Sequence, residues 1–486
     1  MKSGSPTKLG NQRNNSHYKW AVLLMTSIGA FMAPLDGSIV SVSLPSITTG
    51  LNMSYEMAVW VPTAYLAALT VLLLSIGRLS DMRGRKPFFI TGFAIFTLAS
   101  FLCSISSNGL QMIAFRIIQG IGAAFVAATA TAIVTDVFPG KERGKALGIN
   151  VMAVYVGLAL GPSLGGFLTS AVGWRSIFYI NIPIGLFVIL LSLLKLHESS
   201  IPRRTSFDLA GASFFSFGIV PLLLALTLGG IYGWSSFLTT SLLLGALIFL
   251  ILFVLIERRK GDDAMLDTAL FSHNRLFAAA NISALLNYTS FFGISFFISF
   301  YLQRALNMSP IQAGAILFVM PVTMAVLSPV SGWLSDKIGS RALSSLGMAL
   351  ICVGLLWTST LTLTSNSADV AFRLFIIGFG MGLFSSPNTS AVMGSVERSR
   401  LGIASGTLGT MRFLGQSMSL AIMSAVFASF VSSSTLSALF IGINSSTLGV
   451  AAEVFVEGMR ITFIISAIIA AAAVATSLVR GKNKKS

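Results

Sequence analysis

The feature that most constrains this chain is a series of long apolar stretches separated by short polar segments. A helix that crosses a bilayer core needs about 20 mostly apolar residues, and the sequence contains fourteen stretches of that kind. Only 10% of the residues are charged, against roughly 25% in ordinary soluble domains. The sequence therefore predicts an all-α integral membrane protein. The approximate bounds of its spans are 20–47, 55–77, 88–107, 110–136, 145–169, 175–195, 209–229, 236–256, 276–303, 310–333, 342–363, 370–393, 401–430 and 457–479.

The basic residues indicate how the chain is oriented. Its 32 Lys and Arg give a formal net charge of +16. They fall in short clusters between apolar runs, so no nucleic-acid partner is expected. Most lie in the two tails and in the even-numbered loops, which the positive-inside rule places in the cytoplasm. We expect a multi-pass protein of the cell membrane with both termini cytoplasmic. The exceptions are Arg116, Arg175, Arg304, Arg373, Arg412 and Arg460.

Three pairs of matching segments indicate an internal repeat. GRLSDMRGRK (77–86) matches GWLSDKIGSR (332–341), and FRIIQGIG from Phe115 matches FRLFIIGFG from Phe372. A third pair places Gly-x-Ala-x-Gly at the start of spans 5 and 13. Matches in the same order predict two six-helix halves with spans 7 and 8 inserted between them. The predicted parts are a tail (1–19), a half (20–196), the inserted helices (197–274), a second half (275–480) and a basic tail (481–486).

Two parallel halves are an architecture of secondary transporters, which rock the halves around a site near the bilayer midplane. The motifs resemble those of the major facilitator superfamily, and within it the fourteen-helix drug:proton antiporters, over nearly the whole chain. The segments that carry the resemblance are Leu35-Asp36 to Leu44-Pro45, 77–86, Arg116-x-x-Gln119-Gly120-x-Gly122, Gly157 to Gly166, and Gly173 to Pro183. In span 1 the chain has Ser38, Ser41 and Ser43 where that family usually has Thr, Asn and Ala.

Helix breakers are concentrated in span 5, in the segment LGPSLGG. Gly157, Gly161 and Gly165 are four residues apart, so they share one helix face and allow close approach of another backbone. Pro162 bends the helix, and Gly166 follows in the same motif. In the antiporters that the chain resembles, this helix seals the interface between the halves. Plain helix packing is the alternative explanation.

Asp36 is the strongest chemical signal. It lies about 16 residues into span 1, roughly 24 Å along the helix, where a carboxylate costs about 2.5–3.5 kcal/mol on insertion scales. We predict that it carries a proton, attracts a cationic substrate, or does both in turn, with a structural ion pair as the alternative. Arg116 in span 4 lies at a comparable depth, and the resemblance implies a role for it in proton transfer.

The two matching loops are predicted to act as conformational latches. Their acidic residues can cap a helix or pair with a basic residue of the other half, and glycine allows the tight turn. In the resembled family this network holds the outward-facing state. The predicted latch residues are Gly77, Asp81, Gly84, Arg85 and Lys86, with Asp336 and Arg341 as the weaker counterpart.

A substrate pocket is expected between the halves, and polar residues of spans 9, 12 and 13 are candidates to line it. Polar residues also hold membrane helices together, so this alternative stays open for each. Arg412 could bind an anionic substrate. The segment 431–456 is more apolar than most loops and is expected to be partly helical or to lie on the membrane surface. The pocket candidates are Asn287, Tyr288, Phe291, Asn388, Arg412 and Gln416.

Three classes of function follow. The favoured one is a monomeric antiporter in which the proton gradient drives export of amphipathic, cationic drugs. The alternatives are the same fold with a metabolite, amino acid or lipid as cargo, and a membrane sensor that does not transport. The sequence contains no P-loop and no HExxH motif, so we expect neither an enzyme nor a bound cofactor or metal.

Overall fold

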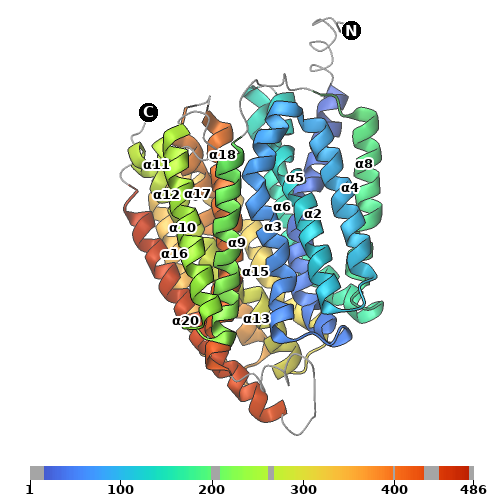
Figure 1. The fold of residues 1–486 in the computed structure, drawn as a ribbon, viewed down its shortest axis with the longest axis vertical. Coiled ribbons are helices and arrows are strands. Elements are labelled where there is room, and N and C mark those ends of the chain that lie inside the picture. The colour runs from blue at the N-terminus through green and yellow to red at the C-terminus, as the bar shows by residue number, and fades with distance from the viewer. Residues whose placement is uncertain are drawn as a thin grey trace, which may run out of the picture.

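The structure is a computed structural model that describes residues 16–138, 140–198, 208–260, 268–397, 400–431 and 448–480. Every regular element in these ranges is a helix. Fourteen helical segments among them are long and apolar enough to cross a membrane, which confirms the predicted fold class. The helices run between two faces (Figure 1). We call the face at which α2 begins the terminal face and the other the opposite face.

The first six membrane crossings form the N-terminal half. Their helices are α2 (Ser16–Gly50), α3 (Tyr55–Arg83), α4 (Arg85–Ser104), α5 (Gly109–Val137), α6 (Gly140–Ala171), α7 (Ser176–Tyr179) and α8 (Asn181–Lys195). The last crossing of this half combines α7 and α8.

The C-terminal half has six further crossings. Its elements are α11 (Thr268–His273), α12 (Arg275–Phe291), α13 (Ile294–Phe300), the π-helical turn η2 (Tyr301–Ala305), α14 (Pro310–Leu317), α15 (Val319–Ile338), α16 (Ser340–Thr358), α17 (Ser367–Gly394), α18 (Leu401–Phe430) and α20 (Leu448–Leu478). Helix α20 includes the end of the apolar segment 431–456, whose residues 432–447 lie outside the described part.

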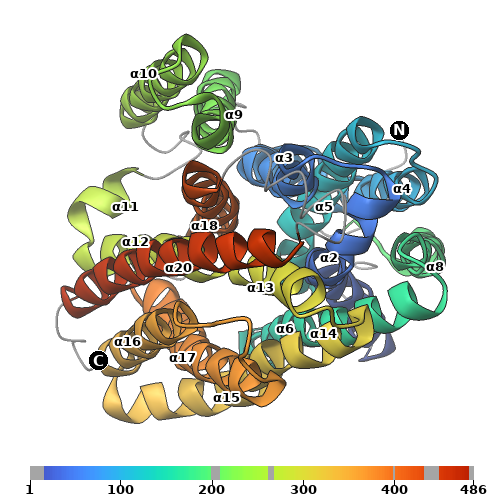
Figure 2. The ribbon, with the colours of Figure 1, turned by 90° about the horizontal axis from the view of Figure 1, so that it is seen from below.

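The inserted helices α9 (Leu209–Tyr232) and α10 (Phe237–Lys260) lie on the flank of the bundle where the two halves meet (Figure 2). Phe215 and Leu223 of α9 share an apolar cluster with Val71 of α3 and Ala421 of α18. Because α3 and α18 belong to different halves, α9 contacts both halves at once.

The repeated loops have the same backbone geometry. Gly84 and Gly339 end α3 and α15 with φ of +100° and +90°, a region that favours glycine. In each case the glycine N–H donates to the serine carbonyl four residues earlier, Ser80 or Ser335. The matching sequences therefore fold into matching turns.

Span 9 is less regular than the sequence indicates. The apolar run 276–303 predicts one helix, but the structure divides the crossing into α12, α13 and η2. At the first break, Gly293 N–H donates to the Ser419 hydroxyl, 2.9 Å away on α18. A side chain thus bonds a backbone donor at the junction, and the π-helical turn lies near the opposite face.

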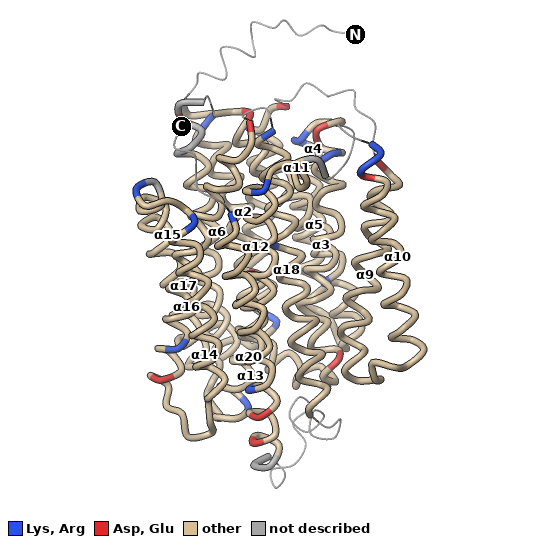
Figure 3. The backbone as a smooth tube through the Cα atoms, turned by 90° about the vertical axis from the view of Figure 1, so that its left-hand side faces the viewer, with Lys and Arg blue, Asp and Glu red and all other residues tan. Residues whose placement is uncertain are grey.

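The charged residues are distributed unevenly between the faces. Figure 3 shows most of the described Lys and Arg at the terminal face, with few along the middle of the bundle. This agrees with the clusters in the sequence, and the cytoplasmic location of that face remains a prediction.

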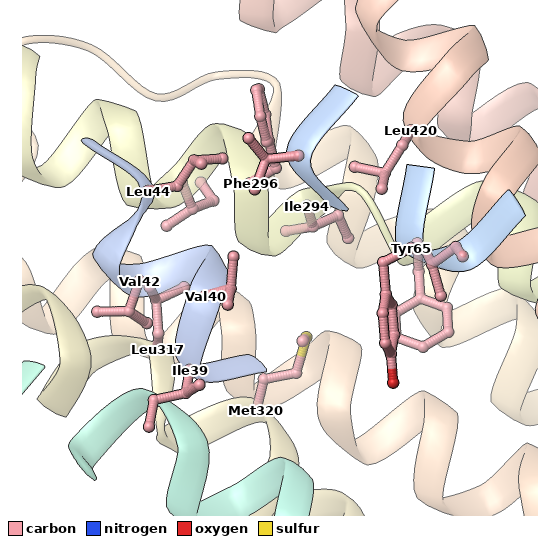
Figure 4. Packing of buried hydrophobic residues seen from close by; sticks show 14 of the residues in the cluster. Ile39, Val40, Val42, Leu44, Tyr65, Ile294, Phe296, Leu317, Met320 and Leu420 are labelled. Atoms are coloured by element: carbon pink, nitrogen blue, oxygen red, sulfur yellow. The ribbon is translucent and has the colours of Figure 1, made fainter. Parts of the chain in front are cut away.

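Side-chain contacts close the bundle at the opposite face. Gln303 Nε2 donates to the Val42 carbonyl at 2.7 Å, and Arg304 Nη2 donates to the Pro45 carbonyl at 2.7 Å. Next to these contacts, an apolar layer joins the two halves. Figure 4 shows part of this layer, in which residues of α2 lie beside residues of α13, α14 and α15: Ile39, Val40, Val42, Leu44, Ile294, Phe296, Leu317 and Met320.

The contacts between α3 and α18 loosen toward the terminal face. Near the opposite face Tyr55 Oη donates to the Ser424 carbonyl at 2.9 Å, and further along the Thr70 and Ser417 hydroxyls are 3.2 Å apart. Cβ atoms built at Gly77 of α3 and at Gly402 and Gly406 of α18 would meet no atom within 4 Å. The described hydrogen bonds between α3 and α18 thus lie toward the opposite face, and these three glycines near the terminal face have open space beside them.

The glycine face of α6 packs closely on its neighbours. A Cβ at Gly157 would overlap the Phe31 carbonyl, and one at Gly161 would overlap the Ser38 hydroxyl, both on α2. A Cβ at Gly166 would overlap the Pro310 carbonyl of α14, in the other half. Helix α6 thus contacts its own half through the face of Gly157 and Gly161 and the C-terminal half through a different face at Gly166, each at near backbone distance.

We expect Gly161→Leu to lower the free energy of unfolding by about 2 kcal/mol or more, because overpacking would force α2 and α6 apart. The control is Gly148→Leu on the same helix, where a Cβ meets no atom within 4 Å. This variant should stay within about 0.5 kcal/mol of wild type. Chemical unfolding of the purified protein in detergent measures both. Equal stability of the two variants would contradict the packing described for α6.

Candidate functional site

The centre of the candidate site is an ion pair between Asp36 of α2 and Arg116 of α5. The Arg116 Nη1 group donates to Asp36 Oδ2, and both side chains are 0% exposed. The structure thus brings together the two residues that the sequence singles out for proton coupling.

The second carboxylate oxygen of Asp36 also accepts hydrogen bonds. Gln119 Nε2 donates to Oδ1 at 2.8 Å and Asn181 Nδ2 donates at 3.1 Å. Both amides also donate to the Ser100 hydroxyl, at 2.9 and 3.4 Å. The groups bonded to the carboxylate are all N–H donors, and an ionised carboxylate only accepts hydrogen bonds, so this arrangement suits the anionic form of Asp36. Helices α2, α5 and α8 of the N-terminal half meet at this one side chain, and Ser100 of α4 joins the network through the two amides.

The Arg116 guanidinium is less completely bonded. Its Nε donates to the Val61 carbonyl at 3.2 Å and its Nη1 to Gln119 Oε1 at 2.6 Å. Its Cζ lies 4.2 Å from the centre of the Tyr65 ring, within cation–π range. Arg116 Nη2 and the Tyr65 hydroxyl have no hydrogen-bond partner among the described residues. The site therefore retains donor groups beyond those that Asp36 occupies.

Open space lies next to the pair along α2. A Cβ at Gly37 would meet no atom within 4 Å, although the neighbouring Asp36 is fully buried. Successive side chains on a helix point about 100° apart. The face of α2 at Gly37 is therefore directed toward open space, while the face at Asp36 is directed toward Arg116. A small rotation of α2 would change what Asp36 faces.

The repeated arginine has a different partner in the C-terminal half. Arg373 of α17 corresponds to Arg116 in the repeated motif, but it pairs with Asp369 four residues earlier at 2.7 Å. The Asp369 side chain is 29% exposed and lies near the opposite face. Only the N-terminal half therefore has a fully buried pair of this kind among the described residues.

The predicted latch residues Asp81 and Arg85 form a charged network at the terminal face. Arg85 Nη2 lies 2.7 Å from Asp81 Oδ1, and Nη1 lies 2.5 Å from Asp136 Oδ2. The Glu198 carboxylate accepts from the backbone N–H groups of Arg85 and Lys86 at 3.0 and 3.2 Å, which caps α4. These partners all belong to the N-terminal half.

The structure describes less of the predicted latch in the matching loop 332–341. Arg341 is exposed in the first turn of α16, and the side chain of Asp336 lies outside the described part. A link between either loop and the other half remains a proposal.

The pocket candidates divide into two groups. Asn287 is fully buried and donates to Met348 Sδ at 2.7 Å within the C-terminal half. Asn388 accepts from Arg480, whose burial lowers its pKa to about 10 and leaves it charged at neutral pH. These two asparagines bond to neighbouring helices. Tyr288, Arg412 and Gln416 are partly exposed, and Phe291 is buried with its ring 5.7 Å from that of Tyr288.

The sequence analysis did not identify Tyr155 or Ser385. Their hydroxyls hydrogen-bond across the boundary between α6 and α17, and Ser385 lies beside Tyr288. No motif marks either residue, because the contact depends on how the two halves dock. Asn181 and Gln119 were part of recognised motifs, yet their bonds to Asp36 became evident only in the structure.

Two helical halves that bond each other at one face, with a buried ion pair inside the first half, have an architecture of secondary transporters. The family model of the Major Facilitator Superfamily matches residues 26–420 and 282–485. The chain belongs to this superfamily, whose members use no bound cofactor.

The relatives carry out different tasks. The chain is 36% identical to the riboflavin transporter RibZ of Clostridioides difficile over 84% of this chain and 88% of that protein. It is 33% identical to the multidrug transporter protein MdtP of Bacillus subtilis over 83% and 75%. A bacterial homologue of the lysosomal transporter Spinster, solved in an inward-facing and occupied conformation, has the same fold at 17% identity. The TM-score is 0.68, and 96% of each chain is covered.

Removing one partner of the buried pair should destabilise the protein more than removing both. We expect Arg116→Met to lower the free energy of unfolding by about 3–5 kcal/mol, because Asp36 would stay buried without its cation. The double variant Asp36→Leu with Arg116→Met should recover part of that loss. A double-mutant cycle by chemical unfolding measures the coupling.

The control cycle uses Glu457 and Arg460, whose side chains are about 60% exposed. Their coupling should be about 0–1 kcal/mol. A coupling no larger at Asp36 and Arg116 than at the control would contradict the burial of the pair.

Proposed function

We propose that the protein is a proton-coupled antiporter that exports amphipathic compounds by alternating access, with Asp36 as the proton carrier and Arg116 as its counter-ion. The observation that carries the proposal is the fully buried pair, which lies in a bundle whose halves are hydrogen-bonded to each other at the opposite face. Charged groups at such depth are costly and typically mark ion pathways.

Helix α2 connects the proton site to the closed face. It holds Asp36 in the middle and, farther along, the Val42 and Pro45 carbonyls that bond Gln303 and Arg304. Protonation of Asp36 removes the charge that Arg116 pairs with, so the force that holds α2 on α5 weakens. A shift of α2 would then alter the contacts that close the opposite face. In this way one proton biases the equilibrium between two conformations.

The direction of transport follows from the charge distribution. If the basic terminal face is cytoplasmic, as the positive-inside rule indicates, we propose that this conformation, closed at the opposite face, loads cargo from the cytoplasm. Protons that enter the cell supply about 2.3 kcal/mol per 100 mV from the electrical gradient alone. We place the protein in the cell membrane as a monomer, since one chain supplies both halves of the site.

Several relatives support export of drugs. The names of MdtP and of the multidrug resistance protein Stp of Mycobacterium tuberculosis, 32% identical over 84% of this chain, denote multidrug transport. With the fourteen spans, they support the fourteen-helix drug:proton branch. The second candidate is transport of a metabolite such as a vitamin, which the similarity to RibZ favours.

A cationic cargo would have to compete with Arg116. Attraction of a cationic drug is one of the roles that the sequence predicts for Asp36, beside carrying a proton, but its carboxylate bonds Arg116, Gln119 and Asn181 in this conformation. A cation could approach Asp36 only after the pair opens, which makes the proton the simpler ligand of this carboxylate.

The charged network at the terminal face fits the same cycle. Arg85 joins α3, α4 and α5 through Asp81 and Asp136. We propose that it keeps the ends of these helices together as one rigid part during switching, with Asp336 and Arg341 as the counterpart. Helix α6, whose glycines contact both halves, would preserve the seal while the halves rock.

Asp36→Asn should abolish gradient-driven transport, because the amide cannot carry a proton at neutral pH. Proteoliposomes with an acidic lumen would be tested for uptake of ethidium, riboflavin and carboxyfluorescein. Wild type should concentrate at least one probe, and Asp36→Asn should fall to the level of empty liposomes. The control is Asp369→Asn, which alters an acid near the opposite face and should transport like wild type.

Gradient-driven uptake by Asp36→Asn equal to wild type would refute the assignment. Uptake by wild type that ignores the gradient would refute antiport. Binding of probes without transport would favour the sensor.

A further inference from the structure

Arg412 differs from the other arginines of the membrane region in its partners. Arg116 and Arg373 each pair with a carboxylate, and Arg304 bonds backbone carbonyls of α2. Arg412 forms no ion pair with a carboxylate in the described part of the chain, and its side chain is partly exposed. Its guanidinium carbon lies 4.8 Å from the centre of the Phe413 ring.

The surroundings of Arg412 come from four helices of both halves. The Tyr288 side chain of α12 lies beside both Arg412 of α18 and Ser385 of α17. Across the boundary, the Tyr155 hydroxyl of α6 hydrogen-bonds Ser385. Gln416 lies one turn along α18 from Arg412, on the same helix face. We call these five residues the Arg412 cluster.

Arg412 lies on α18 between the contact of Ser417 with Thr70 and the start of the helix at the terminal face. On one side, Ser417 still bonds Thr70 of α3 at 3.2 Å. On the other, a Cβ at Gly409 has Leu73 at 3.6 Å as its only neighbour within 4 Å, and one at Gly406 has none. All five side chains are partly exposed. A molecule that enters between the halves from the terminal face would meet this cluster before it reached the apolar layer.

The Arg412 cluster carries a positive charge without a described negative charge beside it. A guanidinium supplies several N–H donors in a planar fork, and no described carboxylate balances its charge. Hydroxyl and amide groups add donors, while the rings of Tyr155, Tyr288 and Phe413 offer flat apolar contact. Since a charge within the membrane region is costly when unpaired, a ligand that brings a negative charge would gain most here.

We propose that the Arg412 cluster is a substrate site for organic anions, namely aromatic amphiphiles that carry a carboxylate or a similar acidic group. The proposal rests on the transporter function proposed above and narrows its amphipathic cargo to anionic compounds. The acidic group pairs with Arg412, Tyr288 and Gln416 contribute hydrogen bonds, and the aromatic body lies against the neighbouring rings. Asp36 takes no part in holding the cargo and remains available for the proton.

Three probes with the same aromatic body test the charge preference. They are pyrenebutanoate, its neutral methyl ester and the pyrenebutylammonium cation. Binding to the full-length protein in lipid nanodiscs is measured at equilibrium, with empty nanodiscs subtracted. We expect the anion to bind at least about tenfold more tightly than either other probe. Equal or tighter binding of the ester or the cation would overturn the proposal.

The variants assign the preference to Arg412. Arg412→Gln should bind the anion only as tightly as the ester, while its affinity for the ester stays unchanged. Arg412→Lys keeps the charge without the planar fork and should retain part of the preference. Tyr288→Phe should weaken binding of the anion by a few-fold and keep the fold intact. The control is Arg460→Gln, an exposed arginine near the opposite face that should bind all three probes like wild type.

An anion preference that survives in Arg412→Gln would refute the site. Because binding is measured without a pH gradient, its outcome is independent of proton coupling. Loss of gradient-driven transport in Asp36→Asn, with the anion preference intact, would separate the two assignments.

Discussion

The structure depends on the ion pair between Asp36 and Arg116, because both side chains are fully buried in a helical bundle that spans the membrane. Each charge alone would cost several kcal/mol at that depth, and only the partner and its hydrogen bonds offset the cost. Gln119 and Asn181 complete the bonds of the carboxylate. Three helices of the N-terminal half, α2, α5 and α8, are thus joined at one acid whose charge a single proton can remove.

The two halves have different chemical tasks in this account. The N-terminal half holds the buried pair, whereas the C-terminal half supplies Arg412, which forms no ion pair with a described carboxylate. Helix α2 links them, since it carries Asp36, packs on the glycine face of α6 and bonds Gln303 and Arg304 near its end. We therefore propose that a change at Asp36 reaches the closed face through one continuous helix, while cargo binds at the separate Arg412 cluster.

Sequence patterns predicted the fold class, because fourteen apolar runs and repeated loops are local features. They also identified Asp36 and Arg116, since charges within apolar runs are conspicuous. They did not locate the breaks in span 9, where the Ser419 side chain on another helix bonds Gly293. They named Asn388, which bonds Arg480, and missed Tyr155 and Ser385, because contacts between distant helices leave no periodic signal.

The central claim is that Asp36 gains and loses a proton as the halves move. Infrared difference spectroscopy of the purified protein in lipid, recorded between neutral and acidic pH, observes the carboxyl group directly. The account predicts a carbonyl band of a protonated, buried carboxylic acid that forms on acidification and is absent from Asp36→Asn. The same band in Asp36→Asn, or no such band in wild type, would contradict it.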